Sequence, residues 1–206
     1  LGDLGGAYSV PTARLGFRLG LFDALKEGPA TPAELAKRCG GLTERYVREW
    51  ALAQAAGGYL EYDPANGTFT MLPEQAMVFA EHDSPVYMAG AYDLVAAMIE
   101  GEAKVEAAFR NGGGVQWGDS AGCLFCSVGA FFRPTYVNSI IQQWLPALDG
   151  VVDKLKSGAR VADVGCGATT AQAIVAAAWI HEDRISFGAA GAGGDGAADR
   201  ARIGVE

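Results

Sequence analysis

The chain has 206 residues, of which half are hydrophobic and 19% are charged, and its formal net charge is −8. That much apolar material excludes wholesale disorder, and the acidic excess argues against nucleic acid as the main partner, because phosphate binding relies on lysine and arginine. Four cysteines are too few for a disulfide framework, and no stretch reaches the roughly 20 apolar residues of a membrane span. The composition therefore predicts a globular, reduced, cytoplasmic protein.

The first third of the chain alternates helical patterns with turn signals. Four apolar residues recur at spacings of three and four, which predicts one helix that ends at Gly28. They are Leu15, Leu19, Phe22 and Leu25. Next, Thr31 and Glu34 have the spacing of a capping box with a proline between them, and they predict a second helix over Pro32–Arg38.

A third helix and a hairpin are predicted to follow. Thr43 is expected to cap the helix, and Gly57 and Gly58 are expected to end it. Its inward face is predicted to carry Tyr46, Val47, Trp50 and Leu52. Two β-rich runs, residues 59–62 and 68–71, flank an Asn-Gly pair and predict a hairpin. Helices followed by a hairpin in this order are typical of a winged-helix domain.

The middle of the chain carries mostly helical patterns. Helices are predicted over residues 73–80, 85–100, 101–110 and 151–156. A stripe that follows Pro134 is predicted to be buried, and it consists of Tyr136, Ile140, Ile141, Trp144 and Leu145. The glycines at 112–114 lie close to Trp117 and predict an ordinary interhelical loop, with a ligand lid as the alternative. Cys123 and Cys126 are expected to be buried small residues rather than zinc ligands or a redox pair.

The most informative pattern is Val-Ala-Asp-Val-Gly-Cys-Gly at residues 161–167. A short apolar strand leads into Gly165 and Gly167, and a helix-compatible run follows them. In doubly wound sheets, ligands bind where a strand turns into a helix. Glycine there tolerates positive φ and lets a ligand lie against bare backbone, and Asp163 can accept the donors of the ligand. Two alternating glycines alone are weak support for such a site.

The longer pattern Val-x-Asp-x-Gly-x-Gly resembles motif I of class I S-adenosylmethionine-dependent methyltransferases. Residues 19–36 and 58–61 are similar to the winged-helix domain that precedes this motif in bacterial members, and residues 131–150 are similar to their linker helix. The resemblance implies S-adenosylmethionine as cofactor. Its methionine part would be held by Asp163, Gly165, Cys166 and Gly167, with Cys166 contributing its backbone. The family also implies that the winged-helix domain pairs two subunits, so we expect a homodimer.

Two features depart from the family pattern. Thr169 stands where members usually have a third glycine, which predicts a looser hold on the cofactor. The acidic residue expected to bind the ribose has two candidates, Glu182 and Asp183. Residues 161–206 are too few for the complete sheet of a class I methyltransferase. We therefore expect a truncated cofactor domain that binds S-adenosylmethionine weakly or not at all.

These patterns predict a mainly α fold in three parts. Residues 1–80 form a winged-helix dimerisation domain, residues 81–157 a helical linker, and residues 158–206 the beginning of a Rossmann-like α/β domain. The predicted function is methyl transfer to an unidentified small molecule, or an inactive fragment of such an enzyme. The alternatives are a winged-helix DNA-binding transcriptional regulator and a non-catalytic dimerisation partner. No catalytic residue, metal site, nucleic-acid partner or membrane partner is predicted.

Overall fold

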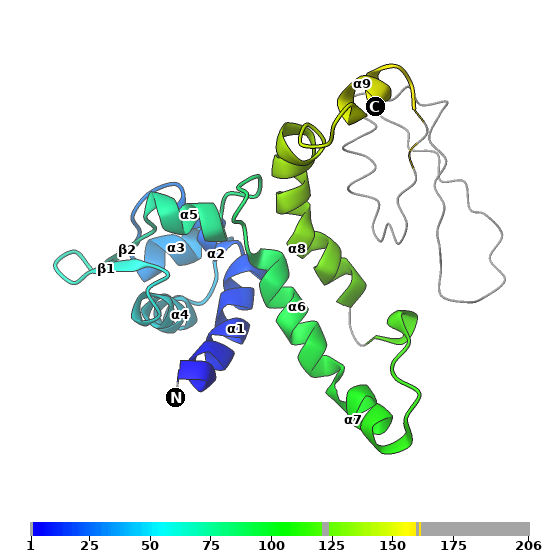
Figure 1. The fold of residues 1–206 in the computed structure, drawn as a ribbon. Helices are drawn as coiled ribbons and strands as arrows, with labels where there is room; N and C mark the ends of the chain where they lie inside the picture. Colours follow the sequence, from blue (N-terminus) through cyan, green and yellow to red (C-terminus); the bar gives the residue numbers. More distant parts are fainter. Residues whose placement is uncertain (1, 121–123, 160, 162–206) are drawn as a thin grey trace. The chain divides into compact units, whose positions relative to one another are not determined.

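The computed structural model describes residues 2–120, 124–159 and 161 (Figure 1). Over these ranges the chain forms helices and one two-stranded sheet, so the prediction of a mainly α fold is confirmed. The chain divides into two compact units, Leu1–Glu100 and Gly101–Glu206. Within the same ranges, no helix has the length and apolar character needed to cross a membrane.

The first unit has the order of a winged-helix domain with one further helix. Its elements are α1 (Gly2–Arg18), α2 (Leu21–Leu25), α3 (Pro32–Arg38), α4 (Glu44–Ala56), β1 (Glu61–Asp63), β2 (Thr68–Thr70), α5 (Pro73–Phe79) and α6 (Ala89–Glu100). The antiparallel hairpin pairs Tyr62 with Phe69, and a bridge joins Phe69 to Ala30 before α3. Helix α6 packs against α1, at the side of the unit away from the hairpin (Figure 1).

One continuous helix was predicted through Leu15 and Leu25, and this is wrong, because the structure has two helices here, α1 and α2. The chain turns after Arg18, and Gly20 adopts a left-handed φ of 69° at the start of α2. Leu15 is exposed, whereas Phe22 and Leu25 are buried. The apolar spacing runs unbroken across the turn, so periodicity alone could not reveal it.

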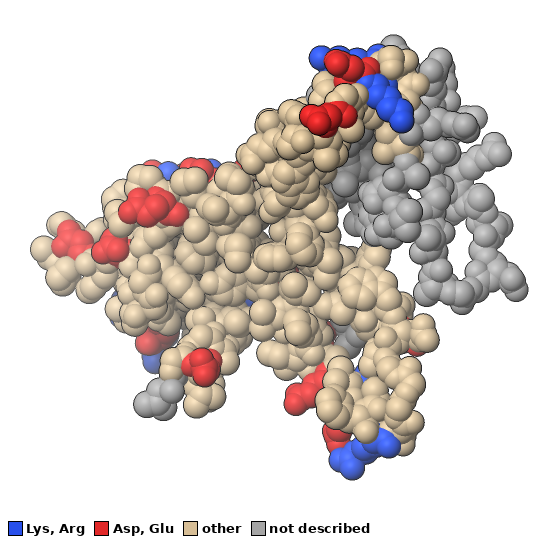
Figure 2. Space-filling view, in the orientation of Figure 1, with Lys and Arg blue, Asp and Glu red and all other residues tan. Residues whose placement is uncertain are grey.

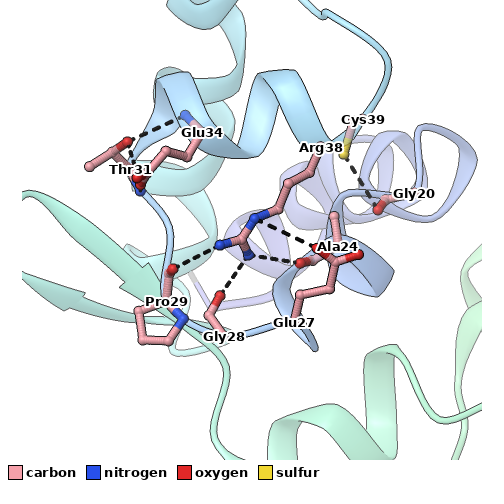
Figure 3. Close-up of polar contacts among 9 residues, drawn as sticks. All are labelled: Gly20, Ala24, Glu27, Gly28, Pro29, Thr31, Glu34, Arg38 and Cys39. Atoms are coloured by element: carbon pink, nitrogen blue, oxygen red, sulfur yellow. Dashed lines mark hydrogen bonds and ion pairs between the residues drawn. The ribbon is translucent and has the colours of Figure 1, made fainter.

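The predicted capping box is confirmed at the start of α3 (Figure 3). The Glu34 amide donates to Thr31 Oγ1 at 3.3 Å, and the Thr31 amide donates to Glu34 Oε2 at 2.8 Å. The hydrogen bonds that the Thr31 amide and the Thr31 hydroxyl donate to the Glu34 carboxylate lower its pKa below the ordinary value. Helix α3 begins and ends at the predicted residues.

The guanidinium group of Arg38 fastens α3 to the preceding loop (Figure 3). Nη1 donates to the carbonyl oxygens of Ala24 and Gly28, at 3.1 and 2.8 Å, and Nη2 donates to that of Pro29 at 3.1 Å. Nε lies 3.8 Å from Glu27 Oε2. Because hydrogen bonds from a charged donor are the stronger ones, a single side chain holds the α2–α3 connection closed.

Replacing Arg38 with methionine is expected to lower the free energy of unfolding by about 2 kcal/mol, because three carbonyl groups lose a charged donor. Urea unfolding followed by circular dichroism measures the change. Arg45→Met is the matched control, since Arg45 is exposed and pairs only within α4. Its effect should stay below about 0.5 kcal/mol. Equal effects of the two substitutions would contradict the role given to Arg38.

An aromatic core joins the helices of the first unit. The ring of Phe22 lies 4.9 Å from Phe79 and 5.1 Å from Trp50, measured between centroids. The Trp50 indole also donates to the Thr12 carbonyl at 2.9 Å, which ties α4 to α1. The predicted inward face of α4 is half correct. Val47 and Trp50 are buried, but Tyr46 and Leu52 are exposed.

The second unit is helical over its described residues. Its elements are α7 (Glu102–Asn111), the 3₁₀ turn η1 (Trp117–Asp119), α8 (Leu124–Ser139), the π-helical turn η2 (Ile140–Trp144) and α9 (Val151–Lys156). Helix α9 has the predicted bounds. Cys126 is exposed and disulfide-bonded, so its interpretation as a buried thiol was wrong. Cys39 in the first unit is a free thiol.

Candidate functional site

An aromatic row follows one face of α8 into η2, and it consists of Phe125, Phe132, Tyr136 and Trp144. The first three are spaced seven and four apart, which places them on the same side of a helix. The Phe132 and Tyr136 rings are nearly parallel, with centroids 5.9 Å apart, and the Trp144 ring stands edge-on to Tyr136 at 6.1 Å. Phe125, Phe132 and Trp144 remain between 41% and 45% exposed. The row is therefore a partly open stacking surface.

The π-helical turn brings Trp144 into the row. The Leu145 amide donates to the Ile140 carbonyl, five residues back, at 3.0 Å. In a regular α-helix residue 144 would lie about 80° around the helix axis from Tyr136. The π-helical turn has more residues per turn, and it reduces this angle. The prediction of a buried stripe after Pro134 is therefore only partly correct. Ile140 is buried, whereas Trp144 is exposed.

The turn η1 lies against the beginning of the row. The Trp117 ring contacts Phe125 with centroids 6.2 Å apart and an interplanar angle of 68°. The Lys104 ammonium group on α7 donates to the Asp119 carbonyl at the end of η1. The three glycines that precede η1, at 112–114, all have positive φ.

The face expected to read DNA in a winged helix carries little free positive charge. On α4, Arg45 Nε lies 3.1 Å from a carboxylate oxygen of Glu49, and Arg48 Nη2 lies 2.6 Å from one of Glu44. Figure 2 shows acidic side chains over the hairpin of the first unit, to which β1 contributes Glu61. Phosphate recognition needs uncompensated lysine and arginine, so this face is poorly suited to it.

Several titratable side chains of the first unit are held in their neutral form. Burial, with smaller contributions from two nearby aspartates, raises the pKa of Tyr87 to about 12. Burial and a hydrogen bond with Tyr59 also raise the pKa of Tyr92. Burial also raises the pKa of the Cys39 thiol. None of these three has the lowered pKa that would activate it as a base or nucleophile near neutral pH.

The predicted cofactor residues lie outside the described residues. They are Asp163, Gly165, Cys166, Gly167 and Asp183, together with the alternative Glu182. The described residues contain no group of three or more metal-ligating side chains. The aromatic row was missed in the sequence, although the spacing of Phe125, Phe132 and Tyr136 could have indicated it.

Residues 8–81 match the family model of the Rv2258c-like winged HTH domain. The matched stretch runs from the middle of α1 to just beyond α5, and it contains the hairpin and the capping box. The N-terminal part of the chain is a winged helix-turn-helix domain. No curated protein matches the chain.

Solved structures extend the likeness beyond this winged HTH domain. The solved structure of PigF with SAH is 18% identical, with a TM-score of 0.59, over 86% of this chain and 54% of that chain. The mitomycin 7-O-methyltransferase MmcR is 20% identical, with a TM-score of 0.58, over 90% and 55% of the two chains. The O-methyltransferase NcsB1, solved with S-adenosylmethionine and a naphthoic acid, is 17% identical, with a TM-score of 0.54, over 87% and 55%.

The structural matches, with TM-scores of 0.54 to 0.59, establish the fold. The chain with its winged HTH domain shares the fold of the class I methyltransferases that it resembles in sequence, so that resemblance is confirmed at the level of fold. The chain spans about half the length of these three structures.

Proposed function

We propose that the protein serves S-adenosylmethionine-dependent methyl transfer to a small molecule in the cytoplasm. The observation that carries the proposal is a succession of features along one chain. A winged HTH domain and helices share the fold of solved methyltransferases, and the motif of Asp163, Gly165 and Gly167 follows them. Each feature alone is common, but their order is that of the enzyme class the sequence resembles.

The residues of the motif have the chemistry that the cofactor needs. When bound, S-adenosylmethionine supplies an electrophilic methyl group to a nucleophile. The Asp163 carboxylate would accept hydrogen bonds from the methionine part, and Gly165 and Gly167, lacking Cβ, would let that part lie against the main chain. Cys166 would contribute its backbone. A carboxylate at Asp183 or Glu182 would accept hydrogen bonds from the ribose hydroxyls.

We assign the acceptor side of the reaction to the aromatic row. Its rings offer faces and edges that are partly exposed, and a planar molecule gains stacking contacts on such a surface. Part of the rate enhancement of a two-substrate transfer comes from holding both reactants in place. A planar acceptor is therefore the class we propose, and the naphthoic acid named with NcsB1 belongs to it.

Cofactor binding is tested by saturation-transfer NMR with S-adenosylhomocysteine, which detects weak complexes. We expect transfer to the ligand from the unaltered chain and its loss in Asp163→Ala, because the carboxylate that accepts the ligand's donors is removed. Asp153→Ala on α9 is the matched control and should leave the transfer unchanged. Equal transfer in the Asp163 and Asp153 variants, or none in the unaltered chain, would contradict the cofactor assignment.

We propose that the winged HTH domain does not bind nucleic acid. The support is the pairing of Arg45 and Arg48 with glutamates of the same helix. Gel-shift titration with random-sequence duplex DNA at low salt should show no complex. A shift that weakens as salt is added would favour the alternative of a transcriptional regulator.

We propose that two copies of the chain pair through an exposed stripe on α1, made of Leu4, Tyr8, Pro11 and Leu15. These residues recur at spacings of four and three, so they share one helix face, and all four are exposed. The opposite face of α1 buries Ala13 and Gly16 in the first unit. A helix that is apolar on both sides exposes surface of the kind that marks a protein interface.

The double substitution Tyr8→Glu and Leu15→Glu should convert the dimer to a monomer, because burying a carboxylate without a partner is costly. Multi-angle light scattering measures the mass directly. Tyr46→Glu, on the exposed side of α4, is the control and should leave the dimer intact. A dimer that survives the double substitution would place the interface elsewhere. A dimer that shows no saturation transfer would favour the non-catalytic partner.

A further inference from the structure

Within the described residues, two side-chain contacts join the turn η1 to α7 and α8. The Trp117 ring stands edge-on to Phe125, and the Lys104 ammonium group donates to the Asp119 carbonyl. Residues 111–119 are all exposed, and Trp117 itself is 51% exposed. A segment that buries so little surface opens at a small free-energy cost.

Three consecutive glycines before η1, residues 112–114, form a hinge in the main chain. Gly112, Gly113 and Gly114 have φ values of 72°, 84° and 68°. Three successive residues in the left-handed region are tolerated by glycine and strained for any other residue. Nothing lies within 4 Å of the position that a Cβ would take at any of the three, so packing does not explain them. Glycine here leaves the segment free to adopt other conformations.

The position of Trp117 connects this hinge to the aromatic row. Phe125 is the first ring of the row, and Trp117 covers one side of it. A planar ligand that used the whole row would need the surface that Trp117 occupies. The glycines, the two contacts of η1 and the partly covered Phe125 ring therefore lie together at one end of the aromatic row.

We propose that Trp117 is a gate on the aromatic row. Rotation at residues 112–114 moves the indole away from Phe125 and breaks the Lys104 contact, and a planar ring of the ligand then takes the vacated place. This proposal rests on the proposed function only for the class of ligand. The movement of Trp117 itself stands on the contacts and the glycines alone.

The first experiment follows Trp117 without any ligand. The four tryptophans of the chain are labelled as 5-fluorotryptophan, and the ¹⁹F resonance of Trp117 is assigned by its loss in Trp117→Phe. We expect Phe125→Ala and Lys104→Met each to move this resonance toward its position in the urea-unfolded chain. Lys154→Met, a matched exposed lysine on α9, should not move it. A resonance that neither substitution moves would overturn the gate.

The second experiment tests whether Trp117 blocks the aromatic row or forms part of the surface that binds the ligand. 2-Naphthoate serves as the planar probe, and its fluorescence reports binding. Removing a competing indole by Trp117→Ala should tighten binding by about threefold to tenfold, the size of a modest competing contact. Weaker binding in Trp117→Ala would overturn the proposal, because Trp117 would then hold the ligand. If the probe binds neither chain, the planar acceptor class fails, and the ¹⁹F result still decides the movement.

Discussion

Gly16→Val is expected to lower the free energy of unfolding of the first unit by about 4 kcal/mol, enough to unfold a marginally stable domain. A Cβ at Gly16 would lie 2.5 Å from Cε2 of Phe22 and 2.6 Å from Cζ2 of Trp50. Both atoms belong to rings that are buried and packed on their other sides, so neither ring can move away without disrupting its other contacts.

The matched control for Gly16→Val lies on the same helix. Gly6→Val places the same side chain at an exposed position of α1 with nothing within 4 Å. It should change the free energy of unfolding by less than about 0.5 kcal/mol. Urea unfolding followed by near-ultraviolet circular dichroism measures both variants. Similar midpoints for the two would contradict the close packing of α1 on the aromatic core.

Phe22→Ala is the second large effect, and we expect it to cost about 4 kcal/mol. The Phe22 ring is 1% exposed and contacts Phe17, Phe79 and Trp50, with centroids between 4.9 and 5.1 Å away. Its removal leaves a cavity between helices that these rings join. The same unfolding measurement reports the loss. Tyr46→Ala, which removes an exposed ring from α4, should cost less than about 0.5 kcal/mol, and an equal loss would contradict the core assignment.

The parts of the fold that local chemistry determines were predictable from the sequence. The capping box of Thr31 and Glu34 starts α3 where expected, because its hydrogen bonds join residues three positions apart. The Asn66-Gly67 pair falls in the connection between β1 and β2, and Gly67 takes the positive φ that a tight connection requires. These signals act within a few residues and need no tertiary partner.

Other features depend on packing and were not predictable from spacing. Leu15 continues the apolar period of Phe22 and Leu25, yet the turn at Gly20 leaves Leu15 on the outside. Tyr46 and Val47 are neighbours on α4, and only the arrangement of α1 and α3 decides which of them is buried. Apolar residues that serve an interface and those that serve the core look alike in the sequence.

The candidate site likewise has one part that the sequence predicted and one part that it did not. The cofactor pattern of Asp163, Gly165 and Gly167 is contiguous, so a sequence can carry it without knowledge of the fold. The aromatic row depends on the π-helical turn at Ile140–Trp144, which changes the helical period. A constant period of 3.6 residues therefore placed Trp144 among buried residues, whereas it stands beside Tyr136 at the surface.

We propose that the chain binds S-adenosylmethionine weakly through the motif of residues 161–167. Ultraviolet crosslinking of radiolabelled S-adenosylmethionine, with mapping of the tryptic peptides, tests it most directly. We predict label in the peptide of residues 161–184, which contains Asp163, Gly167 and Asp183, and we predict that excess S-adenosylhomocysteine removes it. Label confined to peptides of residues 1–100, or label that the competitor does not displace, would contradict the claim.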